Sequence, residues 1–319
     1  MSVVMCLLLY SVAVAVLSPT VLQRLTGAGT APRLGVVAWL AAMISVVASW
    51  LIAAGFLIAA LTWHWEQPGR LAHACFAALC WLFDGGVGPV VQAGIAALAG
   101  VAVGALTMVG WRLGRSMWRA RAQSRGHAEK ARMIGRQIDG VGAVVIDAPE
   151  RAAYCVAGRP DTIVVTSAAL DALTDRHLQV VLAHERAHLT GHHQQVLAFA
   201  RALAAAVPRV ALFSKGAQEI ARLLEMSADD AAARRYGSQT LLDALLALSL
   251  GAPTPQGVVA AAGVDVLDRA ERLVAPFAAR RLWTAGLLLT ATTLLVAGGP
   301  LIHIALSTAG VMWCYPGAA

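Results

Sequence analysis

Four long apolar stretches dominate the sequence and limit the folds open to it. A helix needs about 20 apolar residues to cross the hydrocarbon core of a bilayer. Three of the stretches are long enough, and the first becomes so if its helix continues past Pro19 toward Leu25. The chain is 58% hydrophobic and 13% charged, whereas soluble domains carry about 25% charged residues. We therefore expect a mainly α-helical, polytopic membrane protein with about four transmembrane helices, within residues 3–25, 34–62, 88–111 and 282–306.

Basic residues are distributed unevenly around these stretches, and this distribution predicts the orientation. Two arginines lie between the first and second stretches, eight basic residues follow the third, and two arginines precede the fourth. In the loop at 63–87, Arg70 is the only lysine or arginine. Because lysine and arginine accumulate on the cytoplasmic side of membranes, the N-terminus and this loop should lie outside. We expect a multi-pass protein of the cell membrane, inner or plasma, with residues 112–281 facing the cytoplasm.

The pattern of apolar and polar segments divides the chain into four parts. Residues 1–111 are predicted to form a three-span membrane region with the outside loop 63–87. Within that loop, residues 71–83 are too short to span and suggest an interfacial or re-entrant helix, whose Cys75 and Cys80 can pair or stay free. Three further parts follow: a basic juxtamembrane segment (112–140), a cytoplasmic α+β domain (141–281), and the fourth span with a short outside tail (282–319).

The basic segment alternates arginines with Trp118, a pattern that also occurs in nucleic-acid-binding peptides. It directly follows a predicted span, however, where each basic residue contributes about 1 kcal/mol of attraction to anionic headgroups. No nucleic-acid-binding module stands beside it. We therefore expect the lipid bilayer, and not nucleic acid, as the partner of this segment.

Residues 141–167 contain three short runs rich in β-branched residues, separated by turn-forming residues. They predict a small sheet, with residues 152–156 as the candidate edge strand. A helical pattern then begins at Thr174 or Asp175 and continues through "HLQVVLAHERAHL". Pro208 is expected to end or kink the next helix, and residues 217–237 predict another helix that ends at Gly237.

The sequence "HERAH" places His184 and His188 four residues apart in the first of these helices. On an α-helix this spacing puts both imidazoles on one face, where they can share a zinc ion. Glu185 then reaches a metal-bound water and can act as a general base. This HExxH pattern also occurs by chance on solvated helix faces, so a third ligand decides its meaning.

Two histidine-based routes to a third ligand fit this sequence less well. His192 continues the same face, but it lies about 12 Å along the helix axis from His184. In the metzincin pattern HExxHxxGxxH a glycine turns the chain so that a later histidine folds back. Gly191 fits that pattern, but the last position is Gln194.

A carboxylate on the helix at 217–237 is the third route. Glu225 and Asp229 in "LEMSADDAA" are one turn apart and face the same way. Glu225 can bind zinc, while Asp229 accepts the second ring proton of a ligand histidine and fixes the orientation of that ring. Glu219 is a competitor, but it has no aspartate four residues later.

The combination of "VVLAHERAHL", "EMSADDAA" and the preceding "IVVTSAAL" among membrane spans resembles the gluzincin membrane metallopeptidases. The similarity is strongest to the BlaR/MecR-type peptidases, and next to the prenyl-protein and heat-shock membrane endopeptidases. It implies one zinc ion held by His184, His188 and Glu225, with Glu185 as the catalytic residue. It also implies three spans, a cytoplasmic gluzincin domain and a fourth span, in that order.

The sequence departs from the BlaR/MecR type after the fourth span. Those sensors carry an extracellular penicillin-binding domain with an SxxK nucleophile, which residues 307–319 do not contain. Direct acylation by a β-lactam is therefore not expected. The resemblance still implies that a transcriptional repressor is a candidate substrate, in a signalling or antibiotic-response pathway.

The expected activity is zinc-dependent endoproteolysis on the cytoplasmic side, with a protein or peptide as substrate. Glu185 would transfer a proton from water to the leaving amine, and the substrate would pair with the sheet edge. Tyr236 and His193 are candidate oxyanion donors. The alternatives are a non-catalytic, zinc-containing signalling or scaffold protein, and a quality-control or prenyl-type endopeptidase. The oligomeric state is not predicted.

Overall fold

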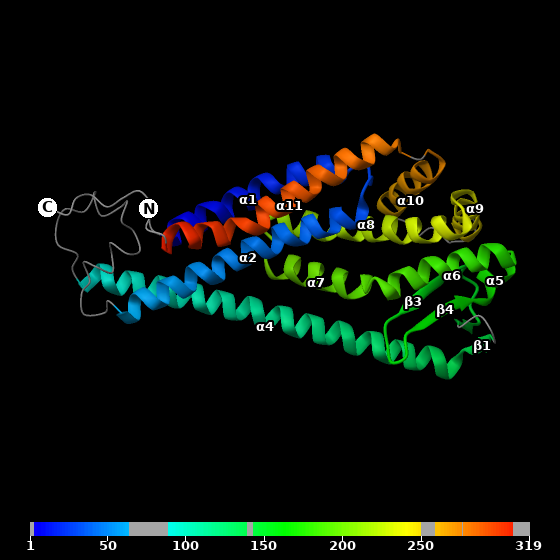
Figure 1. Cartoon of the computed structure of the whole chain (residues 1–319). Helices are drawn as coiled ribbons and strands as arrows, with labels where there is room; N and C mark the ends of the chain where they lie inside the picture. Colours follow the sequence, from blue (N-terminus) through cyan, green and yellow to red (C-terminus); the bar gives the residue numbers. More distant parts are fainter. Residues whose placement is uncertain (1–2, 64–88, 139–142, 250–258, 276, 309–319) are drawn as a thin grey trace.

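The computed structural model describes residues 3–63, 89–138, 143–249, 259–275 and 277–308 (Figure 1). Long helices dominate it, and a small four-stranded sheet lies at one end. The predicted helix at 71–83, Cys75, Cys80 and the tail beyond residue 308 lie outside the described residues. In chain order the elements are α1 (Val3–Thr26), α2 (Pro32–Trp63), α4 (Pro89–Ile134), β1 (Arg136–Ile138), β2 (Ala143–Ile146), β3 (Ala153–Val156), β4 (Thr162–Thr166), α5 (Ser167–Ala172), α6 (Asp175–Thr190), α7 (His193–Ala206), α8 (Ala211–Tyr236), α9 (Ser238–Ser249), α10 (Val259–Val274) and α11 (Ala279–Thr308).

Four helices among the described residues are long and apolar enough to cross a membrane. They are α1, α2, α4 and α11, and the candidate spans lie within Val3–Thr26, Pro32–Ala59, Ala96–Ile134 and Ala279–Ala305. The first helix continues through Pro19, which gives it the length that the sequence left open. Many of their large apolar side chains point outward; Leu295 on α11, for example, is 71% exposed. Such surfaces suit lipid contact, and the prediction of several long apolar helices is confirmed.

Helices α1, α2 and α11 pack side by side and share polar contacts. The Tyr10 hydroxyl on α1 lies 2.9 Å from Ser45 Oγ on α2. Ser45 Oγ in turn donates to the Val296 carbonyl of α11 at 2.8 Å. The Trp50 indole donates to Ser11 Oγ at 3.1 Å. Hydrogen bonds of this kind fix helices to one another where lipid supplies no other partner.

Helix α4 contains both the third predicted span and most of the basic segment, without a break (Figure 1). Beyond its apolar part it reaches the sheet, where Ala128 and Ala131 are buried against Val156 and Val164. The small alanine side chains let the helix approach the strands closely. The described part of the basic segment 112–140 is therefore mostly helical, and its alanines pack against the sheet.

The sheet has the strand order β1-β2-β4-β3. Strands β2 and β4 are parallel, whereas β1 pairs with β2 and β3 pairs with β4 in antiparallel fashion. Three strands agree with the three β-branched runs, and β1 is an addition that the sequence did not predict. Strand β3 lies at the edge of the sheet, as expected for residues 152–156, and it contacts helix α6.

Helices α7 and α8 form a hairpin that packs against the spans. The chain turns at residues 207–210, around Pro208, as the sequence predicts. Phe213 and Ile220 of α8 are fully buried in one core with Trp39 and Met43 of α2, and the Phe213 and Trp50 rings are 6.2 Å apart. The N-terminal half of α8 thus shares its core with the membrane helices, while its C-terminal half extends to α6.

The short turn between α1 and α2 is bound directly to α8 and α10. Arg222 of α8 donates to the Thr26 carbonyl at 2.9 Å, and Arg272 of α10 donates to the Gly29 carbonyl at 2.9 Å. Gly29 has a positive φ of 65°, and a Cβ there would lie 2.4 Å from Met226 Sδ. Only glycine accommodates both this backbone conformation and the close approach.

We predict that Gly29→Ala destabilises the protein by about 1–2 kcal/mol, because the substitution combines backbone strain with overpacking against Met226. Thermal unfolding in detergent micelles measures the effect. Gly100→Ala is the matched control, since a Cβ at Gly100 meets nothing within 4 Å. Equal stability of the two variants would contradict the packing described for the turn.

Candidate metal centre and active site

Two histidines of α6 face one another across a single helical turn. Thr174, whose hydroxyl accepts from the His177 backbone N–H, caps the helix, as the sequence predicts. His184 is buried, with 7% of its surface exposed. The Nε2 atoms of His184 and His188 lie 3.1 Å apart. The two Nε2 atoms therefore face one point, as the i,i+4 spacing predicts.

Glu225 of α8 supplies a carboxylate to the same point. Its Oε2 lies 3.5 Å from His184 Nε2, and its Oε1 lies 3.5 Å from His188 Nε2. One ligand atom from each of the three residues falls within 4.8 Å of the others. Ligand atoms on a tetrahedral zinc with bonds of 2.0–2.1 Å are about 3.3 Å apart. The donor types and their spacing therefore fit a zinc ion.

Two further residues contact the outer nitrogens of these histidines. Asp229 Oδ1 lies 3.0 Å from His184 Nδ1, and His193 Nδ1 lies 3.0 Å from His188 Nδ1. His193 can approach because Gly191 has no side chain; a Cβ there would lie 2.3 Å from His193 Nε2. Each histidine of the pair is thus oriented from behind by a second side chain, as metal-binding histidines commonly are.

Arg269 of α10 completes the cluster from the far side. Its Nε and Nη2 donate to the two Asp229 oxygens at 2.7 and 2.8 Å. Its Nη1 also lies 3.4 Å from Glu225 Oε2. Asp229 is only 1% exposed, so its charge needs such a bidentate partner. Arg269 therefore fixes both carboxylates relative to α6.

The pKa values of the paired groups follow from burial and from these contacts. Burial would lower the pKa of His184, but Asp229 and Glu225 outweigh it and raise that pKa to about 9. Burial, together with the neighbouring cations, lowers the pKa of His188 to about 4. Burial would raise the pKa of Asp229, yet Arg269 and His184 hold it at about 2. His188 is thus neutral at pH 7, the form in which imidazole binds a metal.

Glu185 lies about 100° around α6 from His184, and it hydrogen-bonds to Cys155 of the edge strand β3. It is buried, and burial raises the pKa of its carboxyl group, although the His184 charge and hydrogen bonds from Cys155 oppose this. Burial and the Glu185 charge raise the pKa of the Cys155 thiol to about 12. A thiol with so high a pKa stays protonated and does not act as a nucleophile at neutral pH.

The outer edge of β3 is bonded to a side chain of α7. The Gln194 amide donates to the Cys155 carbonyl, and its oxygen accepts from the Ala157 backbone N–H at 3.1 Å. Together these bonds engage two backbone groups that an added strand would use. Gln194 stands where the metzincin pattern would have its third histidine, and here it binds the sheet instead of the candidate metal position.

The other residues considered from the sequence lie away from the ligand cluster. Glu219 is bound to Arg222 at 2.9 Å. His192 begins the turn into α7 with a positive φ of 50°. Tyr236 lies eleven residues beyond Glu225, about 16 Å along α8, and packs in the core around Val180 and Leu241. Of the two candidate oxyanion donors, only His193 is next to a candidate ligand.

Arg269 is not predicted from the sequence. It lies 40 residues after Asp229, beyond the 250–258 segment, and no spacing rule links the two. The available signal is that Arg269 and Arg272 are three residues apart and share one face of a short helix. Arg272 pairs with Asp230 at 2.7 Å, so consecutive aspartates of α8 each bind one arginine of α10.

We predict that Asp229→Asn weakens zinc binding about 10- to 100-fold. The neutral amide is a weaker acceptor for the His184 Nδ1–H group than the carboxylate, so it orients the ring less firmly. Competition with a chromophoric chelator measures the affinity. Asp230→Asn is the control, since Asp230 contacts Arg272 and none of the candidate ligands. The same affinity in both variants would contradict the role of Asp229.

Arg269→Met is expected to destabilise the metal-free protein by about 3 kcal/mol, because it removes a bidentate partner from a buried carboxylate. Thermal unfolding in a chelator, compared with the wild type, measures the loss. Arg234→Met, a change at an exposed arginine of α8, should leave the unfolding midpoint nearly unchanged. If both variants unfold at the wild-type temperature, Arg269 does not stabilise Asp229.

Comparison with known proteins adds independent information about this region. The family model of Peptidase family M48 matches residues 119–249, which run from the second half of α4 through the sheet to α9. Neither the curated proteins nor the solved structures give a significant match. The matched segment contains His184, Glu185, His188 and Glu225. The match supports an M48 family metallopeptidase, associated with the membrane through its apolar helices.

Proposed function

We propose that the protein is a zinc-dependent endopeptidase embedded in the membrane, with His184, His188 and Glu225 as the ligands of one zinc ion. The observation that carries the proposal is the convergence of these three donors at 3.1–3.5 Å, with Glu185 next to them and facing an edge strand. This arrangement has a metal position, a base and a place for an extended peptide.

In this mechanism Glu185 acts as the general base. Bound zinc would supply a water of lowered pKa and an electrophile for the scissile carbonyl. Burial raises the pKa of Glu185. A carboxylate with a raised pKa accepts a proton from the attacking water more readily than an ordinary carboxylate does. Glu185 accepts the proton of the attacking water and delivers it to the leaving amine. His193 contacts the outer nitrogen of His188 and orients that ligand.

The substrate would extend the sheet along β3. Cys155 and Ala157 direct backbone groups to the outer edge of this strand, and Cys155 is also next to Glu185. A peptide paired with this part of β3 would therefore pass the base and the metal position in an extended conformation. An extended backbone exposes a peptide bond to attack from the side.

We place the site on the cytoplasmic side of the membrane. The turn between α1 and α2 contacts α8 and α10 near the ligand cluster, and α11 begins at this end of the spans (Figure 1). Arg33, one of the arginines predicted to be cytoplasmic, lies at the start of α2, and its Nε donates to Ser227 Oγ at 3.3 Å. Residues 141–281 would then form the cytoplasmic peptidase region, preceded by the basic segment 112–140.

Two substrate classes are compatible with such a site. The resemblance to BlaR/MecR-type peptidases favours a transcriptional repressor cleaved in a signalling pathway. The resemblance to heat-shock and prenyl-protein endopeptidases favours membrane quality control or processing instead. A non-catalytic zinc protein is the remaining alternative, and the position of Glu185 between the histidines and β3 argues against it.

We predict that Glu185→Gln lowers peptide hydrolysis at least 100-fold and leaves bound zinc unchanged, because it removes a general base and no ligand. Cleavage of labelled casein, with metal content measured on the same preparations, tests this. Glu219→Gln should retain activity, and His184→Ala should lose both zinc and activity. Zinc retained without cleavage in the wild type would favour the non-catalytic alternative.

A further inference from the structure

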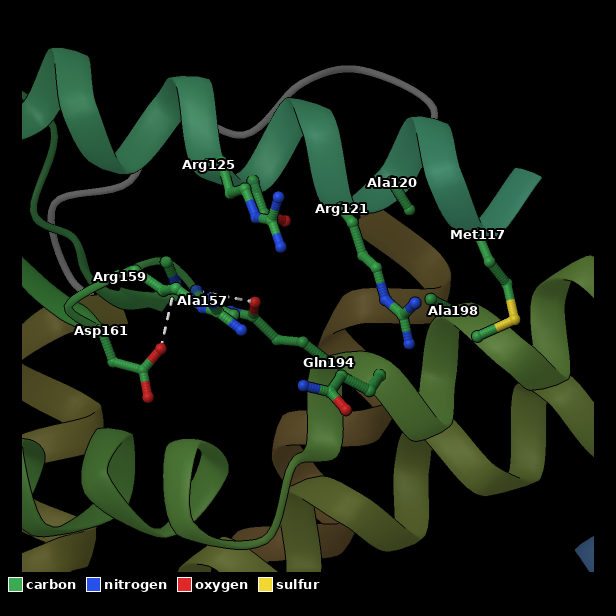
Figure 2. A pocket seen from close by; sticks show the side chains of 12 residues that line it. Met117, Ala120, Arg121, Arg125, Ala157, Arg159, Asp161, Gln194 and Ala198 are labelled. Atoms are coloured by element: carbon green, nitrogen blue, oxygen red, sulfur yellow. Dashed lines mark hydrogen bonds between the residues drawn. The ribbon is translucent and has the colours of Figure 1, made fainter. Parts of the chain in front are cut away.

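A groove of about 340 Å³ lies between α4, α7 and the turn that follows β3. Figure 2 shows Arg121 reaching from α4 toward α7, and Gln194 extending from α7 toward Ala157. The groove is lined by side chains of all three segments. None of them is a candidate metal ligand, so the groove is separate from the zinc position.

Positive charge is in excess in this groove. Arg121 and Arg125 of α4 and Arg159 of the β3–β4 turn line it, and among the described residues of its lining Asp161 is the one that is acidic. Asp161 Oδ1 accepts from the Gly158 backbone N–H at 3.0 Å. Within the described part of the chain, none of the three arginines forms an ion pair. Arginine binds carboxylates with paired N–H donors, so an acidic group is the ligand that this lining favours.

The groove begins where the edge of β3 ends. Ala157, Gly158 and Gln194 line its near end, and Gln194 is bonded to the outer edge of β3. An extended chain advances about 3.3 Å per residue, so the step from Cys155 to Gly158 is about 10 Å. A peptide that pairs with β3 beside Glu185 therefore enters the groove about three residues further on.

Distance from the membrane favours a peptide over a lipid headgroup. The apolar part of α4 ends near Trp111, and Arg121 and Arg125 follow ten and fourteen residues later. At 1.5 Å per residue they lie about 15 and 21 Å beyond it. The headgroup layer of one leaflet is about 5–8 Å thick. Arg112 and Arg115 are placed at headgroup depth, and the groove arginines extend past it.

From these observations we infer that the groove is a substrate subsite that takes an acidic side chain, two to four residues from the scissile bond. This inference rests on the proposed peptidase function and names a substrate class for it, namely peptides with Asp or Glu at that distance. The residues that determine this specificity would be Arg121, Arg125 and Arg159.

Peptide profiling of the full-length protein in phosphatidylcholine nanodiscs tests the inference. A proteome-derived peptide library is digested, and the residues around each cleaved bond are counted. We expect Asp and Glu to be enriched about three- to tenfold at one position two to four residues from the bond, as for a solvent-accessible ion pair supported by more than one arginine. The triple variant Arg121→Gln, Arg125→Gln, Arg159→Gln should lose this enrichment and still cleave neutral peptides. Arg119→Gln, at an arginine of α4 outside the groove lining, should retain it.

A binding measurement separates failure of the inference from failure of the proposed function. Fluorescent peptide pairs that differ only by Glu or Gln at the selected position are titrated into the Glu185→Gln protein, and anisotropy is recorded. A preference for Glu that disappears in the triple variant supports the subsite even if no cleavage is detected. Cleavage without an acidic preference, or a preference that persists in the triple variant, overturns it. So does a triple variant that changes only the affinity for phosphatidylglycerol vesicles, because the groove would then bind headgroups.

Discussion

The buried carboxylate of Asp229 is the interaction on which the arrangement of the site depends. An ionised group with 1% exposure is stable only if charged or hydrogen-bonding partners surround it. Its partners come from two other helices: His184 of α6 at 3.0 Å and Arg269 of α10 at 2.7 Å. Satisfying one carboxylate thus positions α6, α8 and α10 together. Because Glu225 is one turn away on α8, the same contacts place it opposite the histidine pair.

Helix α8 connects this polar cluster to the membrane helices. Its first half is buried with Trp39 and Met43 of α2, and its second half carries Glu225 and Asp229. Between them, Arg222 and Met226 contact the turn that joins α1 to α2. A rigid helix anchored at one end transmits a displacement to the other, so the position of Glu225 depends on the packing of the spans. The helix that carries Glu225 and Asp229 therefore shares a packed core with the long apolar helix α2.

Local sequence patterns predicted the parts of the site that lie within single helices. The spacing of His184 and His188, the Thr174 cap and the turn from Glu225 to Asp229 follow from helix geometry alone. The apolar stretches likewise predicted the membrane helices, since length and composition suffice for that. Strand β1 and the continuity of α4 were not predicted, because the basic residues after Trp111 hid a helix that packs on the sheet through Ala128 and Ala131.

Contacts between distant segments were beyond the reach of these patterns. Arg269 meets Asp229 across 40 residues, and no local period records such a pairing. In the sequence, Gln194 is distinguished only as the position where the metzincin pattern would have a histidine. Its actual partners, Cys155 and Ala157, depend on how α7 lies against β3. Side chains that bridge elements of different type can be assigned only when the tertiary arrangement is known.

In the proposed mode of substrate binding, the edge of β3 contributes little affinity. In the free protein Gln194 already bonds the Cys155 carbonyl and the Ala157 N–H, and Cys155 also hydrogen-bonds to Glu185. A substrate strand would replace these bonds and add few new ones, and exchange of one hydrogen bond for another contributes little net free energy. Backbone pairing would then align the peptide without binding it tightly. In the proposed mode of binding, affinity and selectivity would come from side chains, and the groove beyond Gln194 offers arginines that form no ion pair with any residue the structure describes.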